Sequence, residues 1–174
     1  MTNITVGMAE IAVATGKDDV LVTYALGSCI AVMVHDPVNQ IGGMLHLMLP
    51  ESKVAPDKAI VRPGMFADVG VPRLFHLLYE RGCKKPNLVV KVAGGSQLYD
   101  DHGVFDIGRR NQVMVRKIFW KAGVAVVAED LGGSIPRTAR LWVASGRVTI
   151  SSGNGEVELG TESKERTWKR ASAS

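Results

Sequence analysis

Cys29 and His46 are the residues whose types and spacing suggest covalent chemistry. A thiol is a weak nucleophile until it loses its proton, and a nearby imidazole can take that proton and later return it to a leaving amine. Thr23 precedes the cysteine, and its hydroxyl or carbonyl is suited to fixing the tautomer and pose of the histidine. Gly27 and Ser28 allow a tight turn beside Cys29 and supply main-chain N–H groups for a developing oxyanion.

Two predicted strands must bring this pair together. Residues 30–35 form an apolar run rich in β-branched residues, typical of a buried strand, and residues 41–49 form a second one. The polar segment 36–40 between them predicts an antiparallel hairpin, which brings the start of the first strand near the end of the second. The hairpin thereby closes the sequence separation between Cys29 and His46. A purely structural interpretation remains open, since free cysteine is usually a buried, inert residue.

The rest of the chain predicts an α+β fold with a strand-rich core and about two helices on one face. A pair of glycines, Gly94 and Gly95, permits close backbone approach either to another strand or to substrate, and forms a candidate rim of a substrate cleft. Pro72 predicts a kink or a split in the first helix. Helices are expected over residues 63–81 and 108–122. Further strands are expected over residues 10–15, 20–25, 88–93, 124–128, 138–143 and 147–151, and the last two of these should form a hairpin.

Composition and charge restrict the class of protein. Of the 174 residues, 46% are hydrophobic and 22% charged, as in ordinary globular domains and unlike disordered chains. We expect a single domain over residues 1–160 and a polar, disordered tail over residues 161–174. No apolar run could cross a bilayer and no secretory signal is evident, so a cytoplasmic protein without membrane insertion is expected. The net charge of +4 lacks a basic stripe interleaved with aromatics, which argues against nucleic-acid binding.

The two cysteines, Cys29 and Cys83, form no disulfide framework, which fits a reducing compartment. Cys83 is interpreted as a small packing residue. His102 beside Asp100 and Asp101 is the nearest approach to a metal site, but no second His or Cys stands at ligand spacing. We therefore expect neither a metal nor another cofactor.

Several ordered motifs make the sequence resemble the CheD family of chemoreceptor glutamine deamidases. The resemblance runs from about Val6 to about Ile150. The C-terminal tail of the chain has no counterpart in the family, and Ser96 stands where the family usually has Ala. The motifs are Thr23 with Leu26-Gly-Ser-Cys29, Gly42-Gly-Met-Leu-His46-Leu-Met-Leu-Pro50, Lys91-Val-Ala-Gly-Gly-Ser96, Ile107-Gly-Arg-Arg-Asn111, and Asp130-Leu-Gly-Gly133 followed by Arg137.

The resemblance implies a layered α/β/β sandwich, similar to deamidating cysteine-hydrolase toxins, with Cys29, His46 and Thr23 as the catalytic set. It implies conversion of glutamines on methyl-accepting chemotaxis receptors to glutamate through a thioester, with methyl-ester hydrolysis as a secondary activity. We expect the paired thiol to have a lowered pKa. The alternative is a regulatory binding module for the CheC phosphatase of the CheY response regulator, with catalysis secondary. An unrelated cysteine peptidase is a third reading, weakened because the resemblance points to side-chain amides.

Overall fold

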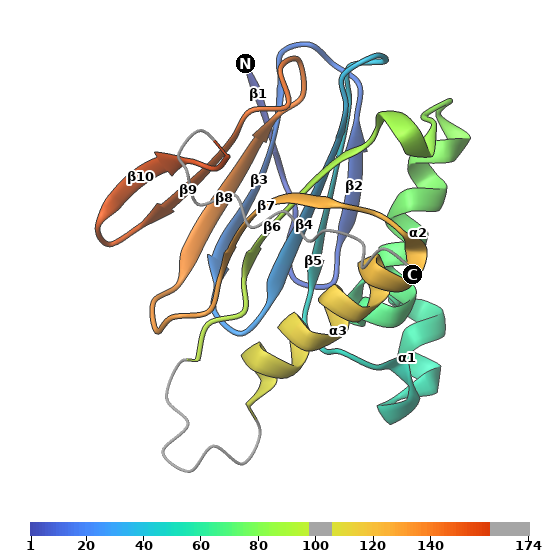
Figure 1. Ribbon diagram of the computed structural model, residues 1–174, viewed down its shortest axis with the longest axis vertical. Helices are drawn as coiled ribbons and strands as arrows, with labels where there is room; N and C mark the ends of the chain where they lie inside the picture. The colour runs from blue at the N-terminus through green and yellow to red at the C-terminus, as the bar shows by residue number, and fades with distance from the viewer. Residues whose placement is uncertain (98–105, 161–174) are drawn as a thin grey trace, which may run out of the picture.

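The computed structural model describes residues 1–97 and 106–160, which fold into three layers (Figure 1). Helices α2 and α3 cover one face of a central five-stranded sheet, and a second five-stranded sheet covers its other face. The predicted α+β sandwich with two helices on one face is confirmed. The expected tail and the polar loop with His102 lie outside the described residues.

The central sheet has the strand order β2-β5-β4-β6-β7, and the outer sheet has the order β1-β3-β8-β9-β10. The strands are β1 (Thr2–Thr5), β2 (Ile11–Ala14), β3 (Asp19–Leu26), β4 (Ile30–Asp36), β5 (Ile41–Leu47), β6 (Val89–Gly94), β7 (Val126–Leu131), β8 (Arg137–Trp142), β9 (Val148–Ser152) and β10 (Gly155–Glu158), and the helices are α1 (Pro56–Val61), α2 (Ala67–Glu80) and α3 (Ile107–Ala122).

The hairpin of β4 and β5 lies at the centre of the molecule, and all residues of both strands are buried. Ile30 and Val32 pack toward the helices, whereas Ala31 and Met33 pack toward the outer sheet. A strand covered on both faces needs apolar residues at every position, which explains its continuous apolar run. The antiparallel hairpin predicted from the sequence is confirmed.

A pair of glycines in β5 keeps the three layers close together. A Cβ added to Gly43 would lie 2.8 Å from Leu74 Cδ1 of α2, and one added to Gly42 would lie 3.1 Å from Val143 Cγ2. Because successive strand residues face opposite sides, the pair relieves crowding on both faces of the sheet. The Gly-Gly of the motif that ends in His46 therefore has a packing role.

The helices differ from the sequence prediction in two places: α1 was not predicted, and the first predicted helix begins later than expected. Residues Pro63–Met65 form a separate 3-10 turn, and α2 begins at Ala67. Of the two outcomes predicted at Pro72, a kink or a split, the split is wrong, because α2 continues through this residue to Glu80. Its buried apolar face outweighs the single backbone donor that proline lacks. The other predicted helix is confirmed as α3, and it ends at Gly123 with a φ of 66°.

Two short strands, β1 and β10, have no counterpart in the sequence prediction. The predicted hairpin near the C-terminus is confirmed as β8 and β9. In the described part of the chain, no helix combines the length and the apolar character needed to cross a membrane.

Candidate functional site

Cys29 lies where the chain crosses from the outer sheet to the central sheet. The segment 27–29 joins the end of β3 to the start of β4. The pairing register of β3 shifts between Thr23 and Leu26, and Ala25 within this bulge has a left-handed φ of 53°. The tight backbone conformation is therefore at Ala25, two residues before the predicted Gly27 turn. The thiol-bearing residue itself is half-buried.

The hairpin places His46 on the same face as Cys29. His46 on β5 lies opposite Ala31 on β4, and Cys29 precedes Ala31 by two positions. Side chains two residues apart on a strand share a face, and diagonal neighbours in an antiparallel pair are about 7–8 Å apart. The thiol and the imidazole thus face the same space between the two sheets, where His46 is only 2% exposed.

Thr23 on β3 determines which nitrogen of His46 carries the proton. Its Oγ1 lies 2.7 Å from His46 Nδ1 and 2.6 Å from the carbonyl oxygen of Val6. Because a carbonyl only accepts, the hydroxyl donates to Val6 and accepts from Nδ1–H. The neutral imidazole then has its lone pair on Nε2, which is buried and has no hydrogen-bond partner among the described residues. The expected contact between Thr23 and the histidine is present.

Burial sets the protonation states of the pair. It lowers the pKa of His46 below the ordinary value of 6.5, while the Val6 carbonyl and the charge of Glu10 act in the opposite direction. Burial also raises the pKa of the Cys29 thiol, with its own backbone N–H opposing this shift. Both shifts favour uncharged groups, so the resting pair is a thiol and a neutral imidazole. The expectation of a lowered thiol pKa is wrong, because desolvation outweighs the local donor.

Gly94 and Gly95 support the backbone of Cys29 from within the protein. The N–H of Gly95 donates to the Cys29 carbonyl at 2.8 Å, and the N–H of Ser96 donates to the Gly27 carbonyl at 2.8 Å. Gly94 has a φ of 113°, and a Cβ there would overlap the Cys29 carbonyl oxygen. Both glycines are buried, and the backbone that they approach closely is that of a neighbouring segment of the chain, while their place at a cleft rim stays a prediction. Their close approach to residues 27–29 holds that segment in place.

Asn111 on α3 completes this support. Its Nδ2 donates to the carbonyl of Ser28 at 2.9 Å and to that of Met48 at 3.0 Å, which ties the segment before Cys29 to the end of β5. In a trans peptide the C=O and the next N–H point in opposite directions, so the N–H of Cys29 is turned away from Asn111. This N–H donates to no backbone carbonyl within the described residues. In the resting site this N–H contacts the Cys29 thiol itself, so it lies beside the sulfur.

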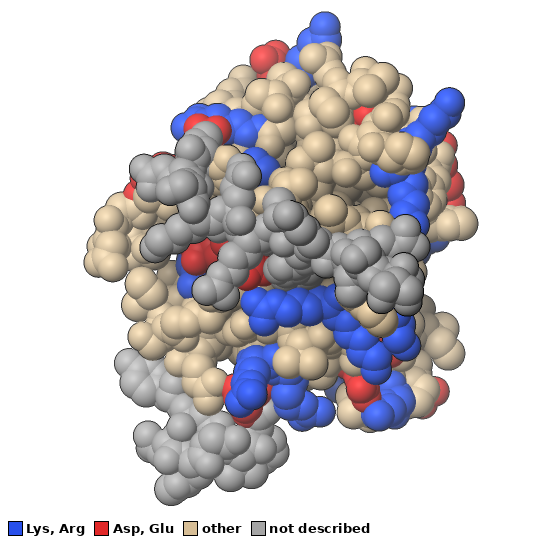
Figure 2. Space-filling view, viewed as in Figure 1, with Lys and Arg blue, Asp and Glu red and all other residues tan. Residues whose placement is uncertain are grey.

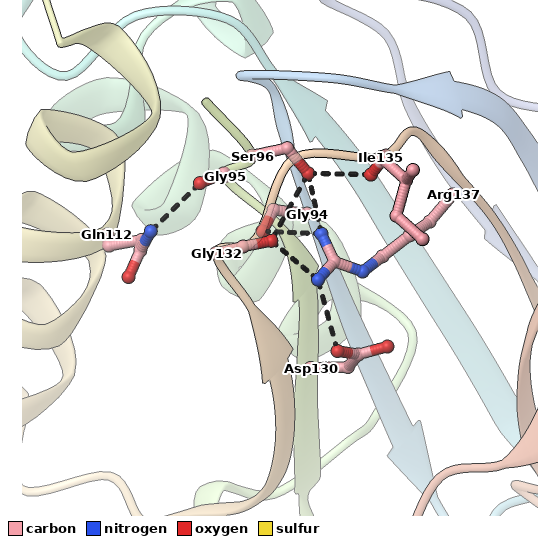
Figure 3. A network of polar contacts seen from close by, with 8 residues as sticks. All are labelled: Gly94, Gly95, Ser96, Gln112, Asp130, Gly132, Ile135 and Arg137. Carbon is pink, nitrogen blue, oxygen red and sulfur yellow. Dashed lines mark hydrogen bonds and ion pairs between the residues drawn. The ribbon is translucent and has the colours of Figure 1, made fainter. Parts of the chain in front are cut away.

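Arg137 holds the end of β6 through a network of polar contacts (Figure 3). Its Nη1 donates to Ser96 Oγ at 2.7 Å and to the Gly94 carbonyl at 3.3 Å, and its Nη2 donates to the Gly132 carbonyl at 2.6 Å. Nη2 also lies 3.2 Å from Asp130 Oδ1. The side chain is only 8% exposed. The guanidinium therefore joins the end of β6 to the loop after β7.

From the sequence, Arg137 has no predicted role, and Asn111 near the start of its helix is expected only to cap the helix or hold the neighbouring loop. A signal for Asn111 was available: it is spaced at successive helical turns from Val115 and Phe119, and all three are buried. A polar residue on an apolar helix face must find buried partners, here two carbonyls. No comparable pattern marks Arg137, whose partners come from distant strands.

Cys83 is separate from this site. It is 5% exposed, and burial together with the neighbouring Asp36 carboxylate raises its pKa to about 11. These surroundings agree with its interpretation as a packing residue. Among the described residues there is no group of three or more His, Cys, Asp or Glu arranged to hold a metal ion.

Comparisons with known proteins agree with these features. A family model described as CheD chemotactic sensory transduction matches residues 48–152. The chain is 53% identical over 159 residues to "Probable chemoreceptor glutamine deamidase CheD 2" of Anaeromyxobacter dehalogenans, covering 91% of this chain and 100% of that protein. It is 46% identical over 157 residues to "Probable chemoreceptor glutamine deamidase CheD 1" of Syntrophus aciditrophicus, covering 90% and 98%. A third relative, "Probable chemoreceptor glutamine deamidase CheD" of Solibacter usitatus, is 44% identical over 159 residues, covering 91% and 94%.

The family model begins after Thr23, Cys29 and His46, but the alignments with the relatives include these residues. An alignment over 159 of the 174 residues necessarily includes the segment from Thr23 to His46. The similarity therefore spans both the site and the scaffold that holds it.

Proposed function

The chain belongs to the CheD family, and we propose that it is a protein-glutamine deamidase that converts glutamines of chemotaxis receptors to glutamate. The observation that carries the proposal is the orientation of His46, whose Nδ1–H is held by Thr23 while its buried Nε2 has no hydrogen-bond partner among the described residues. A nucleophile and an oriented base are what hydrolysis of an unactivated amide requires. The names of the relatives identify the amide as a receptor glutamine.

In the first step the Cys29 sulfur attacks the carboxamide carbon of the glutamine. Its proton passes to His46 Nε2 as the S–C bond forms, because the resting thiol is protonated and the imidazole neutral. The imidazolium that forms keeps its Nδ1–H on Thr23 Oγ1, so the ring does not turn during the transfer. The carbonyl oxygen becomes an oxyanion.

The backbone N–H of Cys29 is the donor best placed for that oxyanion. Asn111 holds the preceding carbonyl of Ser28, and Gly95 holds the carbonyl of Cys29 itself, so both peptide units are fixed before substrate binds. Donors fixed in advance stabilise developing charge without reorganising during the reaction. Gly27 and Ser28 act through this backbone.

In the second half of the reaction His46 returns its proton. Nε2–H protonates the amide nitrogen, the C–N bond breaks, and ammonia leaves a thioester on Cys29. Water then attacks the thioester carbon, His46 accepts its proton, and the Cys29 sulfur leaves and is reprotonated. The sum is glutamine plus water giving glutamate plus ammonia. A receptor methyl ester would follow the same steps with methanol leaving, as a secondary activity.

The direct test is mass spectrometry of receptor fragments incubated with the purified chain, which detects replacement of the amide NH₂ by OH. Deamidation should require Cys29, so Cys29→Ala should give no product. Cys83→Ala is the matched control and should remain active, because Cys83 is a packing residue in a different cluster. Deamidation by the Cys29→Ala variant at the rate of the unchanged chain would contradict the proposal.

Two further elements belong to the proposal and depend on family membership alone. A CheC-type phosphatase is proposed as a protein partner, and the cytoplasm is proposed as the location, since the receptor glutamines would be presented there. Co-purification with a CheC protein from the same cell tests the first, and fractionation tests the second. A regulatory role through such a partner is compatible with the intact catalytic set.

A further inference from the structure

The outward face of α3 carries an unusual combination of exposed residues. Arg109, Arg110 and Lys117 are exposed, as is Lys121, and they share this face with two apolar side chains, Val113 at 56% and Trp120 at 63% exposure. Residues three, four, seven and eight positions apart share one side of a helix, so these residues form a stripe. Figure 2 shows Lys and Arg side chains gathered over α3. We call these six residues the α3 stripe.

The charge of the α3 stripe is not neutralised within the described protein. None of its four cationic side chains makes a hydrogen bond or an ion pair in the described part of the chain. The carboxylate of Glu51 interacts electrostatically with Lys117 and Arg110, but it is paired with Lys53, whose Nζ lies 2.6 Å away. The helix itself contains no Asp or Glu. A surface of this kind attracts acidic partners.

The stability of α3 explains Lys121, which lies in the last turn, but not the rest of this arrangement. Arg109 and Arg110 stand in the first turn, where the helix dipole favours negative side chains, and no acidic residue is present there. An exposed Trp contributes little to the fold of the isolated protein. Trp and Arg are, however, the residue types enriched where protein interfaces gain most of their binding energy. These features indicate a binding surface.

The α3 stripe adjoins the segment that follows His46. A hollow of about 360 Å³ lies between Pro50 and Glu51 on one side and α3 residues including Val113 and Lys117 on the other. On the buried side of the same helix turn, Asn111 holds the carbonyls on both flanks of the site. A polypeptide lying in this hollow is therefore close to the strand that carries the catalytic base.

We propose that the α3 stripe docks an acidic, amphipathic helical segment of the receptor substrate and so delivers its glutamine to Cys29. The inference rests on the proposed function for the identity of the partner. The stripe alternates cationic and apolar side chains over successive turns across about 18 Å, which fits a helix with acidic and apolar residues at successive turns. Charge complementarity selects an acidic partner, and the hollow seats its apolar side chains.

Binding can be measured without catalysis by titrating a labelled cytoplasmic receptor fragment with the Cys29→Ala chain. The test variant adds Arg110→Glu and Lys117→Glu. The matched control adds Arg73→Glu and Lys84→Glu, which are exposed cations on and just after α2 and give the same change in net charge. We expect the test variant to bind about tenfold more weakly and the control to bind within about twofold of Cys29→Ala.

Two further measurements complete the test. Raising the salt concentration should weaken binding of the Cys29→Ala chain but have little effect on the charge-reversed variant. Trp120→Ala, which leaves the charges in place, should also weaken binding, and thermal unfolding verifies that each variant is folded. Equal affinities for the test and control variants, or no binding of the receptor fragment, would overturn the inference. The mass-spectrometric deamidation assay tests the proposed function separately, because it can succeed or fail whatever the α3 stripe binds.

Discussion

Thr23→Val is the most informative single change, because it removes one hydroxyl and nearly preserves the shape of the side chain. Thr23 is fully buried, and its Oγ1 joins Val6 to His46 through two hydrogen bonds of 2.6 and 2.7 Å. In the variant the Val6 carbonyl loses its donor and His46 Nδ1–H loses its acceptor. The hydrogen-bond network that selects the tautomer with a free Nε2 is then absent.

The size of the effect follows from these two contacts. Leaving a buried polar group unpaired costs about 1–3 kcal/mol. Applied to the tautomer that serves as base, this cost corresponds to a loss of about 5- to 150-fold in the rate of deamidation. Stability should fall as well, with the unfolding temperature lower by about 2–4 °C for each kcal/mol lost. Thr23→Ser keeps the hydroxyl and should retain most of the rate.

The assay compares the rate of receptor-fragment deamidation for the unchanged chain, Thr23→Val and Thr23→Ser at a temperature where all three are folded. The rate of Cys29 alkylation by iodoacetamide gives a second reading, since it reports on proton removal by His46 without requiring the receptor. If Thr23→Val stayed within about twofold of the unchanged chain in both rates, the role assigned to this hydroxyl would be refuted.

Three other changes test the surroundings of the site. Because burial raises the pKa of Cys29 above its ordinary 9.0, its alkylation should be slow near neutral pH and accelerate as pH rises past 9.0, and a fast rate that is flat across this range would contradict a neutral resting pair. Cys83, buried and with a pKa of about 11, should react more slowly throughout. Gly94→Ala should abolish deamidation, because the new Cβ overlaps the Cys29 carbonyl oxygen, and normal activity would show that the segment can move aside. Arg137→Met should lower the free energy of unfolding, measured with denaturant, by about 1–3 kcal/mol, because it leaves buried acceptors without their donor, and Arg137→Lys should lower it less. Unchanged stability in both variants would contradict a role of the guanidinium in the scaffold.

Local patterns determined the elements that carry the chemistry. The continuous apolar runs around the polar segment 36–40 require a buried antiparallel hairpin, and that hairpin alone places Cys29 and His46 on one face. The apolar periodicity of α3 and its terminal Gly123 are equally local, so the helix was predicted within one residue at its start. Short strands such as β1 and β10 were missed because partly exposed segments of four residues show no usable periodicity.

Long-range packing decided how the site works. Whether Thr23 would reach the imidazole depended on how the outer sheet packs on the central one, and its second partner, Val6, comes from the segment after β1. What the glycines at 94 and 95 approach could not be read from the sequence, because sequence shows their flexibility but not their burial. The sign of the thiol pKa shift depends on the same property. Residue types indicated the proposed nucleophile and base. Their desolvation depends on the number of layers that cover each group, and only the assembled sandwich contains that information.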